Sequence, residues 1–301
     1  MVNLVEPGET VIVCVNGAFG HRLVENVTRA GGKAVVVNNA WGEVVDENMV
    51  EDAFRKNPDA KMLAFVHAET STGALSDAAA LAAIARKHNA LTIMDCVTSL
   101  GGVPVLLDEW GIDAAYSGSQ KCLSCTPGLA PVSFNERALA KLNARKTPVQ
   151  SWFMDLNLLL GYWSGEGKRT YHHTAPINPL YGLHEALVIL VEGGLETAWA
   201  RHREMYEKLK AGLETLGLTY VVAREEQRLP QLNSVYIPEG VDDAAVRTRL
   251  LDEFGIEIGA GLGPLARKVW RIGLMGHSAR AENIESFVGA LSAILLNKQT
   301  R

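Results

Sequence analysis

The chain has 301 residues, of which 48% are hydrophobic and 21% are charged, a composition typical of a globular protein with a substantial core. At about 100–200 residues per domain, this length predicts two domains. The net charge of −5 argues against the basic surface that nucleic-acid binding requires. No apolar run reaches the ~20 residues of a membrane span, and the first residues lack the pattern of a signal peptide. We therefore expect a cytoplasmic protein with no nucleic-acid or membrane partner.

Apolar runs alternate with helical patterns over the first two thirds of the chain. The predicted strands are rich in Val, Ile and Ala and show little polar alternation, as expected for strands covered on both faces. They are Glu9–Val15, Lys33–Val37, Lys61–His67, Ala90–Asp95, Asp113–Ser117 and Pro131–Phe134. Helices are predicted at Glu47–Lys56 and Ser76–His88, the second with Ser76 as its N-cap. This rhythm predicts an α/β fold with a mainly parallel sheet flanked by helices.

The rhythm changes after the sixth predicted strand. A helix with Asn135 as its N-cap is followed by an irregular stretch, and then by a long helical region from Leu180 to Leu216 that is kinked at Gly193–Gly194. The tail predicts a smaller α+β domain. Its elements are strands Leu218–Ala223, Ser234–Pro238, Ile256–Gly259 and Val269–Leu274 and helices Asp242–Phe254 and Ala281–Leu296. We therefore predict a large domain over residues 1–193 and a small domain over residues 194–301.

Two polar side chains that follow predicted strands define the candidate site. Lys121 ends the stretch Asp113-Ala-Ala-Tyr-Ser-Gly-Ser-Gln-Lys121, and Asp95 ends the apolar run from Ala90. In a parallel sheet both reach the carboxyl edge, where open α/β sheets bind ligands. A buried lysine offers a free amine for Schiff-base chemistry, and a carboxylate can hold the ring nitrogen of a pyridoxal-type cofactor. Taken singly, the two could also be a surface lysine and a helix-capping aspartate.

Three further residues extend this candidate site. Phe19 is flanked by glycines, which let its ring lie over a flat ligand, although it could instead fill the core. Thr70, in His67-Ala-Glu-Thr-Ser-Thr-Gly73, offers a hydroxyl to a cofactor oxygen, unless this stretch only caps the following helix. Arg271 lies in an apolar predicted strand and needs a partner there. A substrate carboxylate suits its guanidinium fork, and an internal salt bridge is the alternative.

Cysteine and histidine patterns argue against a metal or redox site. Cys122 and Cys125 form one C-x-x-C pair among four cysteines, whereas a zinc ribbon needs a second ligand pair. His172 and His173 are adjacent, and adjacent side chains rarely reach the same ion. We therefore expect reduced thiols and no metal.

In chain order, these residues resemble one family, the alanine–glyoxylate, serine–glyoxylate and serine–pyruvate aminotransferases. They are class V enzymes of fold-type I that use pyridoxal 5′-phosphate. The resemblance covers nearly the whole chain and rests on Asn16-Gly-Ala-Phe-Gly20, Glu69-Thr-Ser-Thr-Gly73, Asp95, Gln120-Lys121, Tyr171-His-His-Thr174 and Arg271-Ile-Gly273. It implies an aminotransferase that moves an amino group from alanine or serine to a 2-oxo acid such as glyoxylate or pyruvate.

The resemblance also implies a role for each matched position around the cofactor. Lys121 resembles the Schiff-base lysine, and Asp95 resembles the partner of the pyridine nitrogen. Phe19 resembles the aromatic residue that stacks on the ring. Thr70 lies where a Ser or Thr binds the phenolate side of the ring, and Gln120 resembles a phosphate ligand.

The remaining matches involve the substrate and a second subunit. Arg271 resembles the clamp for the substrate carboxylate. Tyr171 and Thr174 resemble groups that reach the phosphate from the other subunit of a homodimer. Relatives begin with an arm, a strand and a glycine-rich turn that binds the phosphate at a helix N-terminus. This sequence starts near the end of that helix, so we expect it to lack the family's N-terminal segment and to bind the phosphate more weakly.

Three other functions compete with this interpretation. A cysteine desulfurase of the same fold group needs a nucleophilic cysteine well after the lysine, and no cysteine follows Cys125. A non-catalytic scaffold would keep the fold without holding the cofactor. A nucleotide-binding α/β protein would need a G-x-x-x-x-G-K-[ST] motif, which the sequence lacks.

Overall fold

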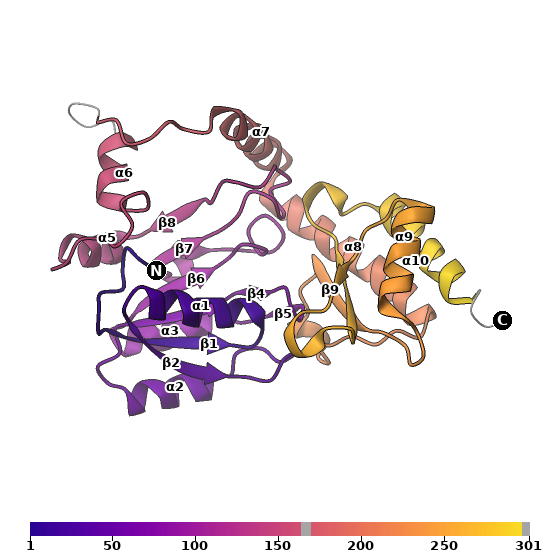
Figure 1. Ribbon diagram of the computed structural model, residues 1–301, viewed down its shortest axis with the longest axis horizontal. Helices are drawn as coiled ribbons and strands as arrows, with labels where there is room; N and C mark the ends of the chain where they lie inside the picture. Colours follow the sequence, from indigo (N-terminus) through magenta and orange to yellow (C-terminus); the bar gives the residue numbers. More distant parts are fainter. Residues whose placement is uncertain (164–169, 297–301) are drawn as a thin grey trace.

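The computed structural model describes residues 1–163 and 170–296. Its first half is built on a six-stranded sheet in the order β2-β1-β3-β6-β7-β8 (Figure 1). The strands are β1 (Thr10–Val15), β2 (Lys33–Asn38), β3 (Met62–Val66), β6 (Leu91–Asp95), β7 (Ala114–Tyr116) and β8 (Val132–Phe134). Neighbouring strands pair in parallel except for the last pair, where β8 runs antiparallel to β7. The predicted α/β class with a mainly parallel sheet is confirmed.

Helices cover both faces of this sheet. On one face, α1 (Ala18–Arg29) buries Leu23 and Val27 in a core shared with the side chains of Val11 and Val13 of β1. On the other face, α2 (Glu47–Lys56) and α3 (Ala78–Lys87) pack on a separate core. Alternate residues of each strand therefore face different helices, which explains why the strands are apolar without alternation.

The short helix α4 (Leu107–Trp110) lies between β6 and β7. After β8, helices connect the sheet to the C-terminal part of the chain. They are α5 (Glu136–Asn143), α6 (Leu156–Trp163), α7 (Ile177–Gly193) and α8 (Leu195–Thr215). Gly194 separates α7 from α8 with a φ of 84°, a backbone conformation that glycine adopts readily. The kink predicted at Gly193–Gly194 is therefore present.

The C-terminal part has its own antiparallel sheet and core. Strands β9 (Leu232–Tyr236), β10 (Gly259–Ala260) and β11 (Val269–Gly273) form this sheet in the order β10-β11-β9. Together with α8, α9 (Asp243–Phe254) and α10 (Ala281–Leu296), they enclose a core centred on the fully buried Trp270. The division at residues 193 and 194 stays a prediction about domains.

Several local predictions need correction. The N-cap of α3 is Asp77, whose side chain accepts a hydrogen bond from the Ala80 N–H, whereas the Ser76 hydroxyl accepts one from the Val45 N–H. Helix α1 was not predicted. Neither were the short strands β4 (Ala68–Glu69) and β5 (Ala74–Leu75), which pair with each other.

Two predicted strands of the small domain are also wrong. Leu218–Ala223 contributes only a single bridge, from Tyr220 to Val235. The carbonyls of Val222 and Ala223 bond to the Arg228 side chain instead of to a neighbouring strand. The predicted strand Ile256–Gly259 is displaced to Gly259–Ala260, because the Ile256 N–H bonds back to the Leu250 carbonyl at the end of α9.

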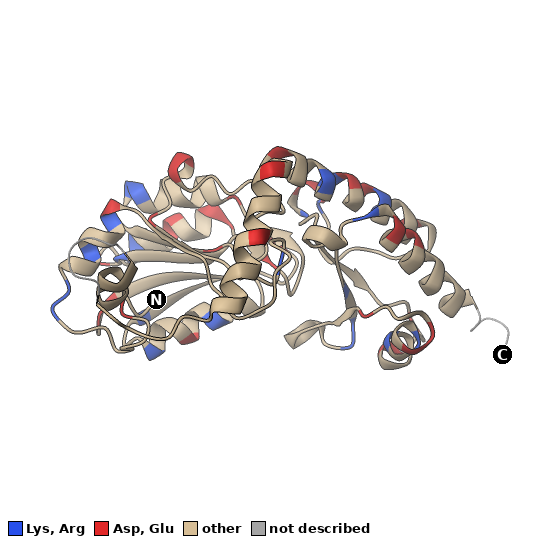
Figure 2. Cartoon of the chain, turned by 90° about the horizontal axis from the view of Figure 1, so that it is seen from above, with Lys and Arg blue, Asp and Glu red and all other residues tan. Residues whose placement is uncertain are grey.

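Surface charge and metal-binding potential are unremarkable over the described part of the chain. Basic and acidic residues are interspersed over the ribbon without a large field of one sign (Figure 2). Within residues 1–163 and 170–296, no helix has an apolar stretch long enough to cross a membrane. The same ranges contain no group of three or more His, Cys, Asp or Glu side chains that could hold a metal ion.

Candidate active site

Asp95 lies at the carboxyl end of β6 and is 7% exposed. One carboxylate oxygen accepts a hydrogen bond of 2.9 Å from the Val97 N–H, and the other accepts one of 2.7 Å from the Tyr116 hydroxyl. Burial raises the pKa of Asp95, whereas these hydrogen bonds and the charges of Arg22 and Lys121 act to lower it. The carboxylate is therefore fixed in direction at the sheet edge, with cationic groups near it.

Lys121 lies in the loop that follows β7 and is partly buried. Its pKa is lowered, first by burial and then by the charge of Arg271, whereas the charge of Asp95 acts in the opposite direction. A lowered pKa leaves more of the amine unprotonated at neutral pH, as a nucleophilic lysine requires. Lys121 is thus close enough to both Asp95 and Arg271 to feel their charges.

Arg271 extends from β11, in the middle of the small sheet. Its Nε donates to the Ala260 carbonyl at 2.7 Å, and its Nη1 donates to the Thr70 carbonyl at 3.3 Å. Burial lowers the pKa of Arg271, and the charge of Glu69 raises it. Ion pairs between the described residues do not include Arg271, so the alternative of an internal salt bridge finds no support. The guanidinium is held by neutral carbonyls, and its charge is not neutralised by direct contact.

Asp95, Lys121 and Arg271 are called the Lys121 cluster below. Phe19 and Thr70 lie on the α1 side of this cluster. Phe19 is the second residue of α1, and the guanidinium carbon of Arg22 lies 4.7 Å from the centre of its ring. Its N–H donates to a carboxylate oxygen of Glu69 at 3.1 Å. Thr70 is buried in the turn between β4 and β5. Both residues are therefore linked to the cluster, one through Glu69 and one through Arg271.

The predicted phosphate ligands are more dispersed. Gln120 is exposed beside Lys121. Tyr171 is 72% exposed, and its hydroxyl lies 2.8 Å from the Thr174 hydroxyl. Both precede α7, in the segment that runs along the top of the view (Figure 1), and the Tyr171 ring also contacts the Tyr162 ring. No hydrogen bond between described residues joins Tyr171 or Thr174 to Lys121.

Three residues around the Lys121 cluster were not predicted from the sequence. Tyr116 lies directly beside Asp95 across the β6–β7 pair. Aligning the ends of these two predicted strands could therefore have placed Tyr116 next to Asp95. Arg22 follows Phe19 by one helical turn, but α1 itself was not predicted. Glu69 was recognised only as part of a motif, and its complete burial had no local signal.

Comparison with known proteins identifies the family. The family model of the class-V aminotransferases matches residues 1–287. The chain is 38% identical to (S)-ureidoglycine--glyoxylate transaminase of Bacillus subtilis, covering 98% of this chain and 74% of that protein. It is 39% identical to alanine--glyoxylate aminotransferase of Rattus norvegicus, covering 98% and 71%. A crystal structure of alanine--glyoxylate aminotransferase from Nostoc sp. superimposes with a TM-score of 0.94 at 46% identity, covering 98% of this chain and 77% of that one.

The chain belongs to the class-V aminotransferase family. The predicted family and the predicted transaminase class are therefore confirmed. The fold is that of the fold-type I pyridoxal-phosphate transferases. The roles assigned to individual residues stay predictions.

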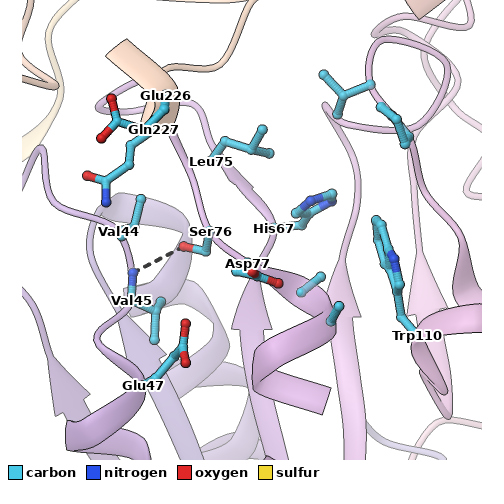
Figure 3. Close-up of a pocket in the computed structure, with 14 residues that line it drawn as sticks. Val44, Val45, Glu47, His67, Leu75, Ser76, Asp77, Trp110, Glu226 and Gln227 are labelled. Atoms are coloured by element: carbon cyan, nitrogen blue, oxygen red, sulfur yellow. Dashed lines mark hydrogen bonds between the residues drawn. The ribbon is translucent and has the colours of Figure 1, made fainter. Parts of the chain in front are cut away.

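A large cavity of this class-V aminotransferase lies away from the cluster. It has a volume of about 490 Å³ and is lined by His67, Ser76, Trp110 and the carboxylates of Glu47 and Asp77, among others (Figure 3). Its walls include residues of the core on the α2–α3 face, whereas Phe19 packs on the core of the α1 face. The lining of the cavity does not include Asp95, Lys121 or Arg271, so the volume of the cavity says nothing about the chemistry at Lys121.

Proposed function

We propose that this protein is a pyridoxal-phosphate-dependent aminotransferase that moves an amino group from a small amino acid, alanine or serine, to a 2-oxo acid such as glyoxylate or pyruvate. The observation that carries the proposal is the placement of three residues from distant parts of the chain. Asp95 is fixed at the end of β6 by two hydrogen bonds, Lys121 follows the neighbouring strand β7, and Arg271 bonds to the Thr70 carbonyl. The names of its relatives add support for glyoxylate as the acceptor.

The side chains present fit pyridoxal 5′-phosphate. Lys121 provides an amine with a lowered pKa, and the Asp95 carboxylate provides an anion fixed by two hydrogen bonds. Phe19 provides an aromatic face at the start of α1. When bound, the cofactor supplies an aldehyde for the substrate amine and a ring that accepts electrons.

Residues of the chain would bind the substrate, move its proton and hold the cofactor. Arg271 binds the substrate carboxylate and fixes the orientation of its Cα–H bond. The Lys121 amine takes the α-proton and returns it to the product, as a base and then as an acid. Asp95 keeps a proton on the cofactor's ring nitrogen, because its negative charge favours the protonated form. Phe19 and Thr70 hold the ring in place, and Gln120 binds the phosphate.

The protein would act as a homodimer in which Tyr171 and Thr174 reach the phosphate of the partner subunit. Helix α7, which follows these residues, has no buried residue, although most of its side chains are apolar. A helix that is apolar on all sides is stable in water only when another surface covers it. A second copy of the chain would cover α7 and supply the two missing phosphate ligands together.

The test combines cofactor binding with transamination. Purified protein should develop a visible absorbance band with pyridoxal phosphate and should transfer the amino group of alanine, serine or ureidoglycine to glyoxylate. Borohydride reduction and peptide mapping should place the pyridoxyl label on Lys121, and Lys121→Ala should lose both label and turnover. A label on another lysine would refute the assignment of Lys121. Absorbance without turnover for any of these donors would favour a non-catalytic scaffold.

A further inference from the structure

Glu69 is a buried carboxylate that the proposed reaction does not use. Its side chain has no solvent exposure, and it is the last residue of β4, directly before the turn to β5. One oxygen accepts hydrogen bonds from the Phe19 and Gly20 N–H groups at 3.1 and 3.2 Å. The other accepts bonds from the N–H and hydroxyl of Ser71 at 3.0 and 2.6 Å. A buried carboxylate is costly unless such donors surround it, so this arrangement needs an explanation.

The arrangement caps α1 from a distant part of the chain. The N-cap residue, Gly17, has no side chain to satisfy the free N–H groups of the first turn. The Ser71 hydroxyl accepts from the Ala18 N–H at 2.9 Å, and Glu69 accepts from the next two N–H groups. A Cβ at position 17 would lie 2.3 Å from the Ser71 Oγ, so glycine there is required for the turn to approach. The first turn of α1, which carries Phe19, is therefore fixed by the β4–β5 turn.

The same turn also contacts the substrate clamp. The Thr70 carbonyl, one residue after Glu69, accepts a hydrogen bond from Arg271 at 3.3 Å. Among charged groups, Glu69 is the one whose negative charge favours the protonated guanidinium of Arg271. The segment from Glu69 to Ser71 therefore contacts both sides of the site. Glu69 fixes the backbone of Phe19, and the Thr70 carbonyl next to it holds the Arg271 guanidinium.

We propose that Glu69 is the positioning residue of this site, which sets the place of the Phe19 ring against the cofactor and, through the neighbouring Thr70 carbonyl, the place of the Arg271 guanidinium. The proposal rests on the proposed function, because that function makes the cofactor the partner of the Phe19 ring and the substrate carboxylate the partner of the Arg271 guanidinium. It goes beyond helix capping, because a cap alone would change stability and leave ligand affinities unchanged.

The main variant is Glu69→Gln, which keeps the size of the side chain. An amide NH₂ cannot accept hydrogen bonds, so two of the donors lose their acceptor whichever way the amide turns. An unsatisfied buried donor costs about 1–3 kcal/mol, which corresponds to roughly ten- to hundredfold in an equilibrium constant. We expect the cofactor dissociation constant to rise by about this factor. The KM for the amino acid should also rise relative to that for an amine without a carboxylate.

The matched control is Asp242→Ala. The Asp242 side chain caps α9 by accepting from the Ala245 N–H at 2.7 Å, and no hydrogen bond between described residues joins it to Glu69, Phe19 or Arg271. It should lower the melting temperature but leave the cofactor dissociation constant and the KM ratio unchanged. A Glu69→Gln protein that behaves like this control would overturn the proposal and leave the transaminase function intact.

Two further measurements separate positioning from general damage. In the cofactor-free protein, hydrogen exchange at the Phe19 and Gly20 amides should accelerate about tenfold or more in Glu69→Gln and stay parental in Asp242→Ala. In a Phe19→Leu background, which keeps the N–H groups, Glu69→Gln should lose most of its effect on cofactor affinity. An undiminished effect would show that Glu69 does not act through the ring.

Two outcomes need separate treatment. If Glu69→Gln does not fold, Ser71→Ala replaces it, because it removes one donor to Glu69 and the acceptor of the Ala18 N–H. Ser71→Ala should raise the cofactor dissociation constant and the KM ratio in the same direction, but by smaller factors. Parental cofactor affinity in Ser71→Ala would overturn the proposal. If the parental protein itself binds no cofactor, the proposed function fails and the positioning role fails with it.

Discussion

Two regions of this aminotransferase place their side chains in opposite ways. At the carboxyl edge of the large sheet, polar side chains are buried, and most of them have hydrogen-bond partners. Asp95, Glu69 and Ser71 are 7%, 0% and 0% exposed. Between the sheet and α8, large apolar side chains are exposed instead. Trp152 is 61% exposed, and Val191 is 70% exposed.

Both arrangements cost free energy in an isolated chain, and each indicates a different missing partner. Burying a carboxylate costs several kcal/mol unless hydrogen bonds and charges compensate it, so the sheet edge is organised around chemistry. Exposing a large apolar surface is costly in water, so the exposed apolar side chains of residues 152–163 and 170–191 are consistent with the proposed association. The predictions below alter one region at a time.

The largest effect is expected from the charge at the sheet edge. Asp95→Asn keeps the shape and the acceptor for the Tyr116 hydroxyl but removes the negative charge. Loss of one electrostatic element aimed at developing charge costs about 10²–10³ in rate, and we expect that fall in kcat. Asp77→Asn, the same exchange at the N-cap of α3, is the control and should leave kcat unchanged. Near-parental turnover of Asp95→Asn would show that Asp95 does not support the ring nitrogen.

A smaller effect is expected from the fork that holds the substrate. Arg271→Lys keeps one positive charge but loses the paired N–H groups, at about 1.5–3 kcal/mol for a charge-assisted hydrogen bond. The KM for alanine should rise roughly ten- to hundredfold, whereas an amine without a carboxylate should react as it does with the parental protein. Equal losses for both substrates, measured by steady-state kinetics, would indicate a structural role for Arg271 through its bonds to Thr70 and Ala260.

The sheet edge could be anticipated from the sequence because its signals are local. Asp95 and Lys121 each follow a run of strand-forming residues, and Arg271 interrupts one, so strand ends and buried charge suffice to select them. In the folded chain the charges of Asp95 and Arg271 both act on the pKa of Lys121. The N-caps of α5 and α9, Asn135 and Asp242, also follow from local pattern, since each precedes a helical run.

The missed features depend on distant contacts. Helix α1 starts at a glycine with no capping side chain, and its caps come from Glu69 and Ser71, about fifty residues later. Helix α7 starts at Ile177, before the predicted start at Leu180, and Pro179 lies in its first turn, where proline is tolerated because its N–H is not needed. Nothing near α1 in the sequence reveals its distant caps.

The exposed apolar region can be tested by introducing a charge. Val191→Glu should weaken self-association by at least about tenfold, because an unpaired charge in an apolar interface is costly. Leu251→Glu is the matched control, since Leu251 is 49% exposed on α9, and it should leave the association constant unchanged. Sedimentation equilibrium measures both variants. If Val191→Glu associates as the parental protein does, another surface must form the dimer and another segment must supply its phosphate ligands.

The smallest effect concerns the other face of the sheet, where His67 is 4% exposed and burial lowers its pKa from 6.5 to about 4. Its folded-state pKa is below the unfolded value, so the unfolded chain binds the proton first on acidification. The stability associated with neutral His67 is complete above pH 6.5 and is lost as the pH falls toward 4. Between pH 7 and pH 5 this loss is roughly 2 kcal/mol, or several degrees in Tm for a chain of this size.

His67→Phe keeps an aromatic ring beside Trp110 without a titrating group, so its Tm should fall less steeply over this range. His277→Gln, at an exposed position of the small C-terminal part, should follow the parental slope. Parallel acid profiles for His67→Phe and the parental protein would show that the proton affinity of His67 does not differ between the folded and unfolded states.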